Sequence, residues 1–206
     1  MPAGPPPMAP TTPLPPMTPL PPGFLEAPFA HRALHGPGRP ENSREAILAA
    51  VDAGFGIELD VQASADGAAI VFHDYDLARL TGQSGPVQAR SAAELSQMPL
   101  LGSPTAPPTL GEALTLVAGQ VPHLIEIKDQ DGALGPNVGP LEAAVAEAIS
   151  GYAGPLAVMS FNPHAVAALA TLAPDVPRGL TTEVFTQESW PSVPEARRDA
   201  LTQIPQ

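Results

Sequence analysis

The chain has 206 residues, a formal net charge of −12 and a pI of about 4.6. This length fits one domain with a sizeable core, and the negative charge argues against nucleic acid or an anionic membrane as a partner. Cysteine is absent, which excludes disulfides, and no apolar run approaches the roughly 18 residues of a membrane span. Because no basic residue precedes Arg32, a secretory signal is not expected, and we predict a cytoplasmic protein.

The first segment, residues 1–23, is about half proline. Proline removes backbone donors and fixes φ, so this segment is predicted to form no helix or sheet. We expect a disordered or wrapping arm, followed by a folded domain over residues 24–206.

Strand-like and helix-like patterns alternate through that domain. Strands are predicted at residues 28–33, 55–61, 68–73, 123–128, 156–161 and 178–183. Helices are predicted at residues 42–53, after Ser91, from Thr109 to about Ala118, and at residues 139–150, 163–172 and 194–203. The starts rest on Ser91–Glu94 and Thr109–Glu112 capping boxes and on an Asn162-Pro163 pair.

This alternation predicts an α/β fold with a parallel sheet covered by helices. Charged pairs stand near the ends of four strands, and such ends converge most easily around a closed ring. We therefore predict a TIM-type (β/α) barrel. Only about six strands are found, so the barrel is expected to be incomplete, with its C-terminal strands missing. An open edge would favour a homo-oligomer.

The second and fourth strands carry ionisable residues two positions apart. Glu58 and Asp60 share one face of the first of these strands, and Glu126 and Lys128 share one face of the other. Buried carboxylates are costly unless a cation holds them together. With the His31-Arg32 and His73-Asp74 pairs at other strand ends, the pattern is typical of metal-assisted phosphoryl transfer.

Each residue also has a plainer interpretation. His31 alone could be a core histidine, and Glu58 and Asp60 could lie on a solvated edge strand. Asp74 is interpreted as a structural residue that accepts backbone hydrogen bonds in a turn. Lys128 could be a surface cation, but the face it shares with Glu126 favours a functional role.

Five ordered motifs, AHRA, PENS, IELDV, VFHD and IEIK, resemble the glycerophosphodiester phosphodiesterase family, as do MSFNP and PPTLGEAL. The resemblance covers roughly residues 30–185. It implies hydrolysis of deacylated phospholipid headgroups, such as glycerophosphocholine or glycerophosphoethanolamine, to glycerol 3-phosphate and an alcohol. The attacking oxygen is that of water or of the glycerol 2-hydroxyl.

The resemblance also implies a role for each matched residue. Glu58, Asp60 and Glu126 would bind one divalent cation, Mg²⁺ or Ca²⁺. His31 and His73 would be the acid–base pair, and Arg32 and Lys128 would hold the phosphoryl oxygens. Two further residues would support the site from its rim, namely Glu41 and Asn42. Counting formal charges, the site would be neutral with metal and a phosphodiester bound.

The chain departs from the family pattern in three places, the first of which is an inserted LHGPGR before Pro40 that lengthens the loop beside the site. Ala33 replaces the usual glycine, which is acceptable if the backbone keeps a negative φ. Nothing matches the later family strand whose tryptophan lines the pocket, and Trp190 is interpreted as part of a loop over the barrel. The remaining histidines are expected to be structural or solvent-facing, namely His35, His123 and His164. Alternatives are a lysophospholipid-directed relative, for which no apolar groove is found, and a truncated, non-catalytic fragment that binds metal or phosphoester weakly.

Overall fold

The computed structural model describes residues 18–204, so the expectation for residues 1–17 of the arm lies outside the described part. In the remainder of the arm, the Thr18 hydroxyl donates a hydrogen bond to the Pro174 carbonyl at 3.0 Å. Just beyond it, Phe24 is buried and packs against Phe29, with 5.1 Å between ring centroids. The end of the arm thus lies against the folded domain.

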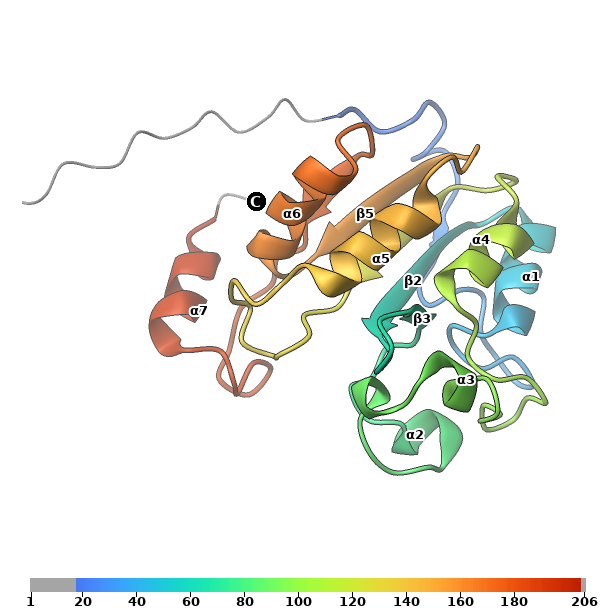
Figure 1. Ribbon diagram of the computed structural model, residues 1–206. Coiled ribbons are helices and arrows are strands. Elements are labelled where there is room, and N and C mark those ends of the chain that lie inside the picture. Colours follow the sequence, from blue (N-terminus) through green and yellow to red (C-terminus); the bar gives the residue numbers. More distant parts are fainter. Residues whose placement is uncertain (1–17, 205–206) are drawn as a thin grey trace, which may run out of the picture.

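The fold is built on one sheet with helices along its outer face (Figure 1). Its strands are β1 (Phe29–Ala30), β2 (Gly56–Ala63), β3 (Ala69–Val71), β4 (His123–Ile127), β5 (Leu156–Ser160) and β6 (Arg178–Leu180). Neighbouring strands are parallel in the order β1-β2-β4-β5-β6. In the described part of the chain, β1 and β6 do not pair with each other. The predicted incomplete (β/α) barrel is therefore confirmed.

The helices begin and end largely where the sequence signals place them. They are α1 (Arg44–Ala53), α2 (Ala78–Thr81), α3 (Ala92–Leu95), α4 (Leu110–Val117), α5 (Pro140–Ile149), α6 (Pro163–Leu172) and α7 (Glu195–Thr202), with a 3₁₀ turn at Val87–Ala89. Both capping boxes form, and the Asn162 side chain caps α6. Gly54 ends α1 with φ of 71°, the left-handed conformation that favours glycine.

The prediction of six barrel strands is wrong in one respect. The third strand, predicted at 68–73, covers only β3, pairs antiparallel with β2 and lies off the main path of the sheet. A short turn through Gly67 returns the chain beside β2, so β3 forms a hairpin rather than a barrel strand. The first strand, predicted at 28–33, ends at Ala30 because Arg32 and Ala33 turn with positive φ.

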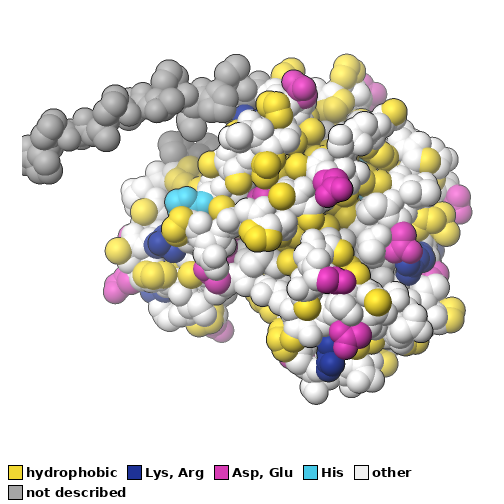
Figure 2. Space-filling view, viewed as in Figure 1, with side chains coloured by type: hydrophobic (Ala, Val, Ile, Leu, Met, Phe, Trp, Pro, Cys, Tyr) yellow, Lys and Arg dark blue, Asp and Glu magenta, His cyan; other side chains and the backbone are white. Residues whose placement is uncertain are grey.

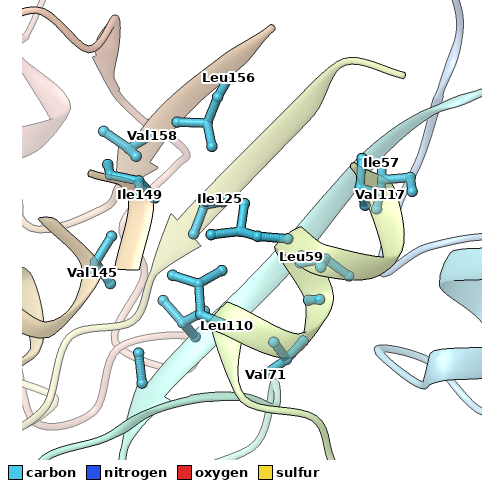
Figure 3. Packing of buried hydrophobic residues seen from close by; sticks show 14 of the residues in the cluster. Ile57, Leu59, Val71, Leu110, Val117, Ile125, Val145, Ile149, Leu156 and Val158 are labelled. Atoms are coloured by element: carbon cyan, nitrogen blue, oxygen red, sulfur yellow. The ribbon is translucent and has the colours of Figure 1, made fainter. Parts of the chain in front are cut away.

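The main core lies between the outer face of the sheet and helices α1, α4 and α5 (Figure 3). Strand side chains alternate, and one set is fully buried against these helices: Ile57, Leu59, Val61, Ile125 and Ile127. Burial of this apolar layer is the main driving force for the fold. The alternation also directs the charged residues of β2 and β4 to the inner face, where they converge.

Two smaller clusters flank the sheet. The segment that contains α2 and α3 has its own core around Phe72, Leu77 and Leu95, and it projects from the sheet in Figure 1. The C-terminal segment with α7 packs around Leu134, Phe185 and Val193. Both lie at the end of the sheet where the parallel strands finish. Over residues 18–204, every helix is too short or too polar to cross a bilayer.

Candidate functional site

Three predicted carboxylates meet on the inner face of the sheet. Glu58 and Asp60 come from β2 and Glu126 from β4, with Asp60 and Glu126 paired in register. One oxygen from each lies within 4.8 Å of the others, and all three residues are buried. This confirms that the sequence pattern gathers the three side chains at one point.

The trio has the donor chemistry of a divalent cation site. Burial, together with the neighbouring Asp60 charge, raises the pKa of Glu58 to about 8. Its Oε1 is buried and has no hydrogen-bond partner among the described residues. Hard carboxylate oxygens suit Mg²⁺ or Ca²⁺, so the residues fit one such ion.

Two predicted cations lie beside the carboxylates. The Lys128 ammonium donates to Glu126 Oε1 at 2.6 Å and pairs with Asp60 Oδ1 at 2.8 Å. The Arg32 guanidinium donates to Glu41 Oε1 at 3.0 Å, while its Nε lies 3.7 Å from Asp60 Oδ2. That Nε is buried and without a hydrogen-bond partner in residues 18–204. A buried donor, Arg32 Nε, and a buried acceptor, Glu58 Oε1, are therefore available to bind a ligand.

The turn after β1 fixes this arrangement. The Arg32 backbone N–H donates to Glu58 Oε2 at 2.8 Å, and the buried Asn42 amide donates to Asp60 Oδ2 at 2.9 Å. Arg32, Ala33 and Asn42 have φ of 55°, 62° and 58°, in the left-handed region. The condition that Ala33 keeps a negative φ is therefore not met. Glu41 and Asn42 thus contact Arg32 and Asp60 from behind the cleft, and Asn42 is buried there rather than at the rim.

Both predicted histidines line the same cleft as Asp60, Glu126 and Lys128. Partial burial and the adjacent Arg32 charge lower the pKa of His31, which favours the neutral imidazole at pH 7. His73 follows β3, and its Nδ1 lies 2.8 Å from Asp74 Oδ1. Because a carboxylate only accepts, Nδ1 carries the proton and Nε2 is left for proton transfer.

Three residues around His73 were not predicted to act together. Asp74 accepts hydrogen bonds from His73 and Arg79 side chains, which corrects its interpretation as an acceptor of backbone bonds in a turn. The Arg79 side chain lowers the pKa of Asp74 to about 2. Gln62 is buried and donates to the carbonyls of His73 and Asp74 at 2.9 and 2.6 Å. The alternation Glu58, Asp60, Gln62 was the available signal for Gln62.

The cleft extends from the carboxylates to a wall formed by the C-terminal segment. Its volume is about 1000 Å³, and Phe161, Glu183 and Trp190 line it. The Trp190 ring packs 5.4 Å from Phe161 between centroids, and its N–H donates to Glu183. Trp190 is thus a cleft residue, which its interpretation as a loop over the barrel did not include. Figure 2 shows a notch between the α7 side and the α2–α3 side of the molecule.

The other histidines lie away from this cleft. His35 and His164 are exposed, in agreement with a solvent-facing role. His123 is fully buried at the start of β4, and both ring nitrogens are without a hydrogen-bond partner in the described part of the chain. Burial lowers its pKa to about 4. It is a structural residue, as expected.

Carboxylates and cations at the carboxyl ends of parallel strands, with two imidazoles beside them, define a (β/α)-barrel protein with a candidate site for a metal ion and an anion. The model of the glycerophosphoryl diester phosphodiesterase family matches residues 31–202. The chain therefore belongs to this family, as the resemblance indicated.

Two known proteins match much of the chain. An uncharacterized protein of Mycobacterium tuberculosis is 34% identical over 143 residues, which are 63% of this chain and 46% of that protein. A glycerophosphodiester phosphodiesterase of Caldanaerobacter subterraneus subsp. tengcongensis is 30% identical over 161 residues, which are 73% of this chain and 65% of that one. The chain thus spans about half to two thirds of the length of these relatives.

A solved structure shows the same fold. It is a phosphodiesterase of Oleispira antarctica in complex with the product sn-glycerol-3-phosphate. The TM-score is 0.70 at 27% identity, and the match covers 87% of this chain and 73% of that one.

Proposed function

We propose that the protein hydrolyses glycerophosphodiesters to glycerol 3-phosphate and an alcohol, with a divalent cation and two histidines. One observation carries the proposal. The buried trio Glu58, Asp60 and Glu126 lies beside Arg32 Nε, which has no hydrogen-bond partner in residues 18–204. The cleft there also holds His31 and His73. The product bound to the Oleispira antarctica protein supports the choice of substrate.

The metal would be held by the three carboxylates. Once bound, Mg²⁺ or Ca²⁺ supplies positive charge that stabilises the phosphoryl oxygens. Arg32 would donate its Nε–H, which has no hydrogen-bond partner among the described residues, to the same anion. Lys128 has three N–H donors, two of which are used by Glu126 and Asp60, so the third remains for a phosphoryl oxygen. Both groups thereby compensate the charge that builds up in the transition state.

The histidines would divide the proton transfers. His31 has a lowered pKa and is the base that removes the proton from the attacking oxygen. His73 would act as the acid in its doubly protonated form: Asp74 holds the Nδ1–H, and the second proton, on Nε2, passes to the departing alcohol. The attacking oxygen is that of water or of the glycerol 2-hydroxyl; detection of a cyclic glycerophosphate would identify the second.

The aromatic wall would receive the alcohol. Phe161 and Trp190 offer ring faces, and the cleft is also lined there by the carboxylates of Asp131, Glu183 and Glu188. Ring faces and carboxylates together favour a cationic group. This supports alcohols such as choline and ethanolamine over neutral polyols.

A second candidate is a non-catalytic fragment that binds metal or phosphoester weakly. The observation in its favour is the sheet, in which β1 and β6 remain unpaired with each other over residues 18–204. The two functions differ in whether the bound phosphodiester is cleaved, so an assay of product release distinguishes them.

The test is release of glycerol 3-phosphate from glycerophosphocholine by the purified chain, with Mg²⁺, with Ca²⁺ and with a chelator. We expect turnover that needs metal and falls by 10²-fold or more in His31→Ala and in His73→Ala, the usual scale for acid–base groups. His35→Ala, at an exposed site outside the cleft, is the matched control and should keep full activity. Metal binding without turnover would favour the fragment.

A further inference from the structure

We propose that Arg79 is a positioning residue that holds His73 and Arg32 in place through two carboxylates. The inference rests on the proposed function and adds a residue that has no contact with the three metal-binding carboxylates in the hydrogen bonds and ion pairs of the described chain. Arg79 lies on the short helix α2, outside the barrel, and its side chain is 48% exposed.

The guanidinium of Arg79 binds both carboxylates at once. Nε and Nη2 donate to Asp74 Oδ2 and Oδ1 at 2.6 and 2.8 Å. Nη1 and Nη2 donate to Glu41 Oε2 and Oε1 at 2.9 and 2.6 Å. Four of the five guanidinium N–H groups are therefore used, in two forked pairs whose planar geometry lysine cannot reproduce.

Each carboxylate in turn holds one residue of the site. Asp74 Oδ1 lies 2.8 Å from His73 Nδ1, and Glu41 Oε1 accepts from Arg32 Nη1 at 3.0 Å. A continuous path of charged contacts thus runs from the imidazole through Asp74, Arg79 and Glu41 to the phosphate-binding arginine. Gln62 fixes only the backbone of His73, so the ring orientation depends on Asp74.

Electrostatics explains why Arg79 is needed. Carboxylate oxygens of Glu41 and Asp74 lie within 4.8 Å of each other and of a His73 nitrogen. Two carboxylates so close repel each other unless a cation stands between them. Without Arg79 they would separate, and His73 and Arg32 would move with them. Shifts of about 1 Å in such groups can cost on the order of 10²-fold in rate.

A purely structural role of Arg79 would appear as a loss of stability, whereas a positioning role appears as a loss of activity. An exposed ion pair contributes little to stability, so loss of Arg79 should leave the melting temperature nearly unchanged. The matched control is Arg90, which belongs to the same projecting segment and pairs with Glu94 at 3.9 Å, away from the cleft.

The experiment compares Arg79→Gln, Arg79→Lys and Arg90→Gln with the wild type in metal-saturated form. We expect kcat to fall roughly 10–100-fold in Arg79→Gln, the scale for outer supports of a site. Arg79→Lys should recover part of this loss, because lysine restores the charge but not the double fork. KM should change less than kcat, and Arg90→Gln should match the wild type. An unchanged kcat in Arg79→Gln would overturn the proposal.

A measurement that needs no turnover separates this inference from the proposed function. The ¹⁵N chemical shifts of the His73 ring report which nitrogen carries the proton. In the wild type the proton should sit on Nδ1, and in Arg79→Gln the two nitrogens should become more alike, as in the exposed His164. Identical His73 spectra in both proteins would refute the positioning role. If the His73 spectra differ between the wild type and Arg79→Gln but the wild type shows no turnover, the proposed function alone is refuted.

Discussion

Burial of the Glu58 carboxylate carries an electrostatic cost. Glu58 is buried beside Asp60 and Glu126, and its pKa is raised to about 8 chiefly by burial. The folded pKa is above the ordinary value of 4.5, so in the metal-free chain this group contributes stability below pH 4.5 that is lost as the pH rises through 8. A bound cation removes this cost, because it compensates the carboxylate charge.

Metal binding should therefore release a proton. Below pH 8 the metal must displace the proton on Glu58, so the apparent affinity should rise up to about tenfold per pH unit between pH 6 and 8. Titration calorimetry with Mg²⁺ and Ca²⁺, in buffers of different ionisation enthalpy, counts the proton. Glu58→Gln should bind more weakly and lose most of this pH dependence. Proton-free binding by the wild type would show that Glu58 is not a ligand.

Ala33 tests how far the turn after β1 depends on its backbone. Its φ is 62° and its side chain is buried, and a left-handed conformation costs a non-glycine residue about 1–2 kcal/mol. Ala33→Gly removes this backbone strain. The gain is offset by greater freedom of the unfolded chain and by loss of a buried methyl, each about 0.5–1 kcal/mol. The free energy of unfolding should then change by less than about 1 kcal/mol.

Ala33→Val, by contrast, should lose about 2 kcal/mol or more, because a β-branched residue is both strained at this φ and too large for the site. Denaturant unfolding of both variants checks the pair. Equal stability of the valine and glycine variants would contradict the observed backbone conformation.

At the scale of elements, period-two alternation was enough to place Glu58, Asp60, Glu126 and Lys128, because parallel strands of a sheet end at one edge. Cap signals likewise placed the starts of α3, α4 and α6. Sequence could not show that β3 runs antiparallel, since strand direction depends on pairing and not on pattern. Arg79 escaped because α2 has only four residues, too few for a hydrophobic period, and its partners are 5 and 38 positions away.

The segment from Glu183 to Val193 forms the second wall of the cleft. Phe161, Phe185 and Trp190 pack together there, with Phe185 and Trp190 centroids 5.9 Å apart. The sequence around Trp190 has neither helical nor strand periodicity, so its place in the cleft depends on this aromatic contact between distant segments.

Trp190→Ala should discriminate between substrates. Loss of the ring removes a face for a cationic alcohol, a contact worth about 0.5–2 kcal/mol, so KM for glycerophosphocholine should rise about 2–30-fold. KM for glycerophosphoglycerol, whose alcohol is neutral, should change much less. Val184→Ala, an exposed neighbour outside the cleft, is the control. Equal losses for both substrates would mean that Trp190 supports the wall without contacting the headgroup.

At the scale of the whole molecule, the two ends of the sheet have different tasks. Strand β4 begins at the buried His123 and carries Glu126 near its other end, so one strand connects the packed base with the reactive edge. In a (β/α) barrel the base contributes stability and the carboxyl ends of the strands contribute chemistry. His123 is therefore a probe of the fold that does not touch the site.

Acid should destabilise the fold through His123. Its folded pKa, about 4, is below the ordinary 6.5, so its contribution is complete above pH 6.5 and is lost as the pH falls toward 4. The loss should reach on the order of 3 kcal/mol. His123→Leu removes two buried nitrogens that have no partner within the described chain, so it should stabilise the protein and abolish this loss. Because Glu58 titrates with the opposite sign, the quantity to measure is the difference in unfolding free energy between variant and wild type from pH 4 to 7. His164→Leu, at an exposed position, is the control, and its difference in unfolding free energy from the wild type should not change with pH. If the difference for His123→Leu were also constant, His123 would stay protonated or solvated in the native state.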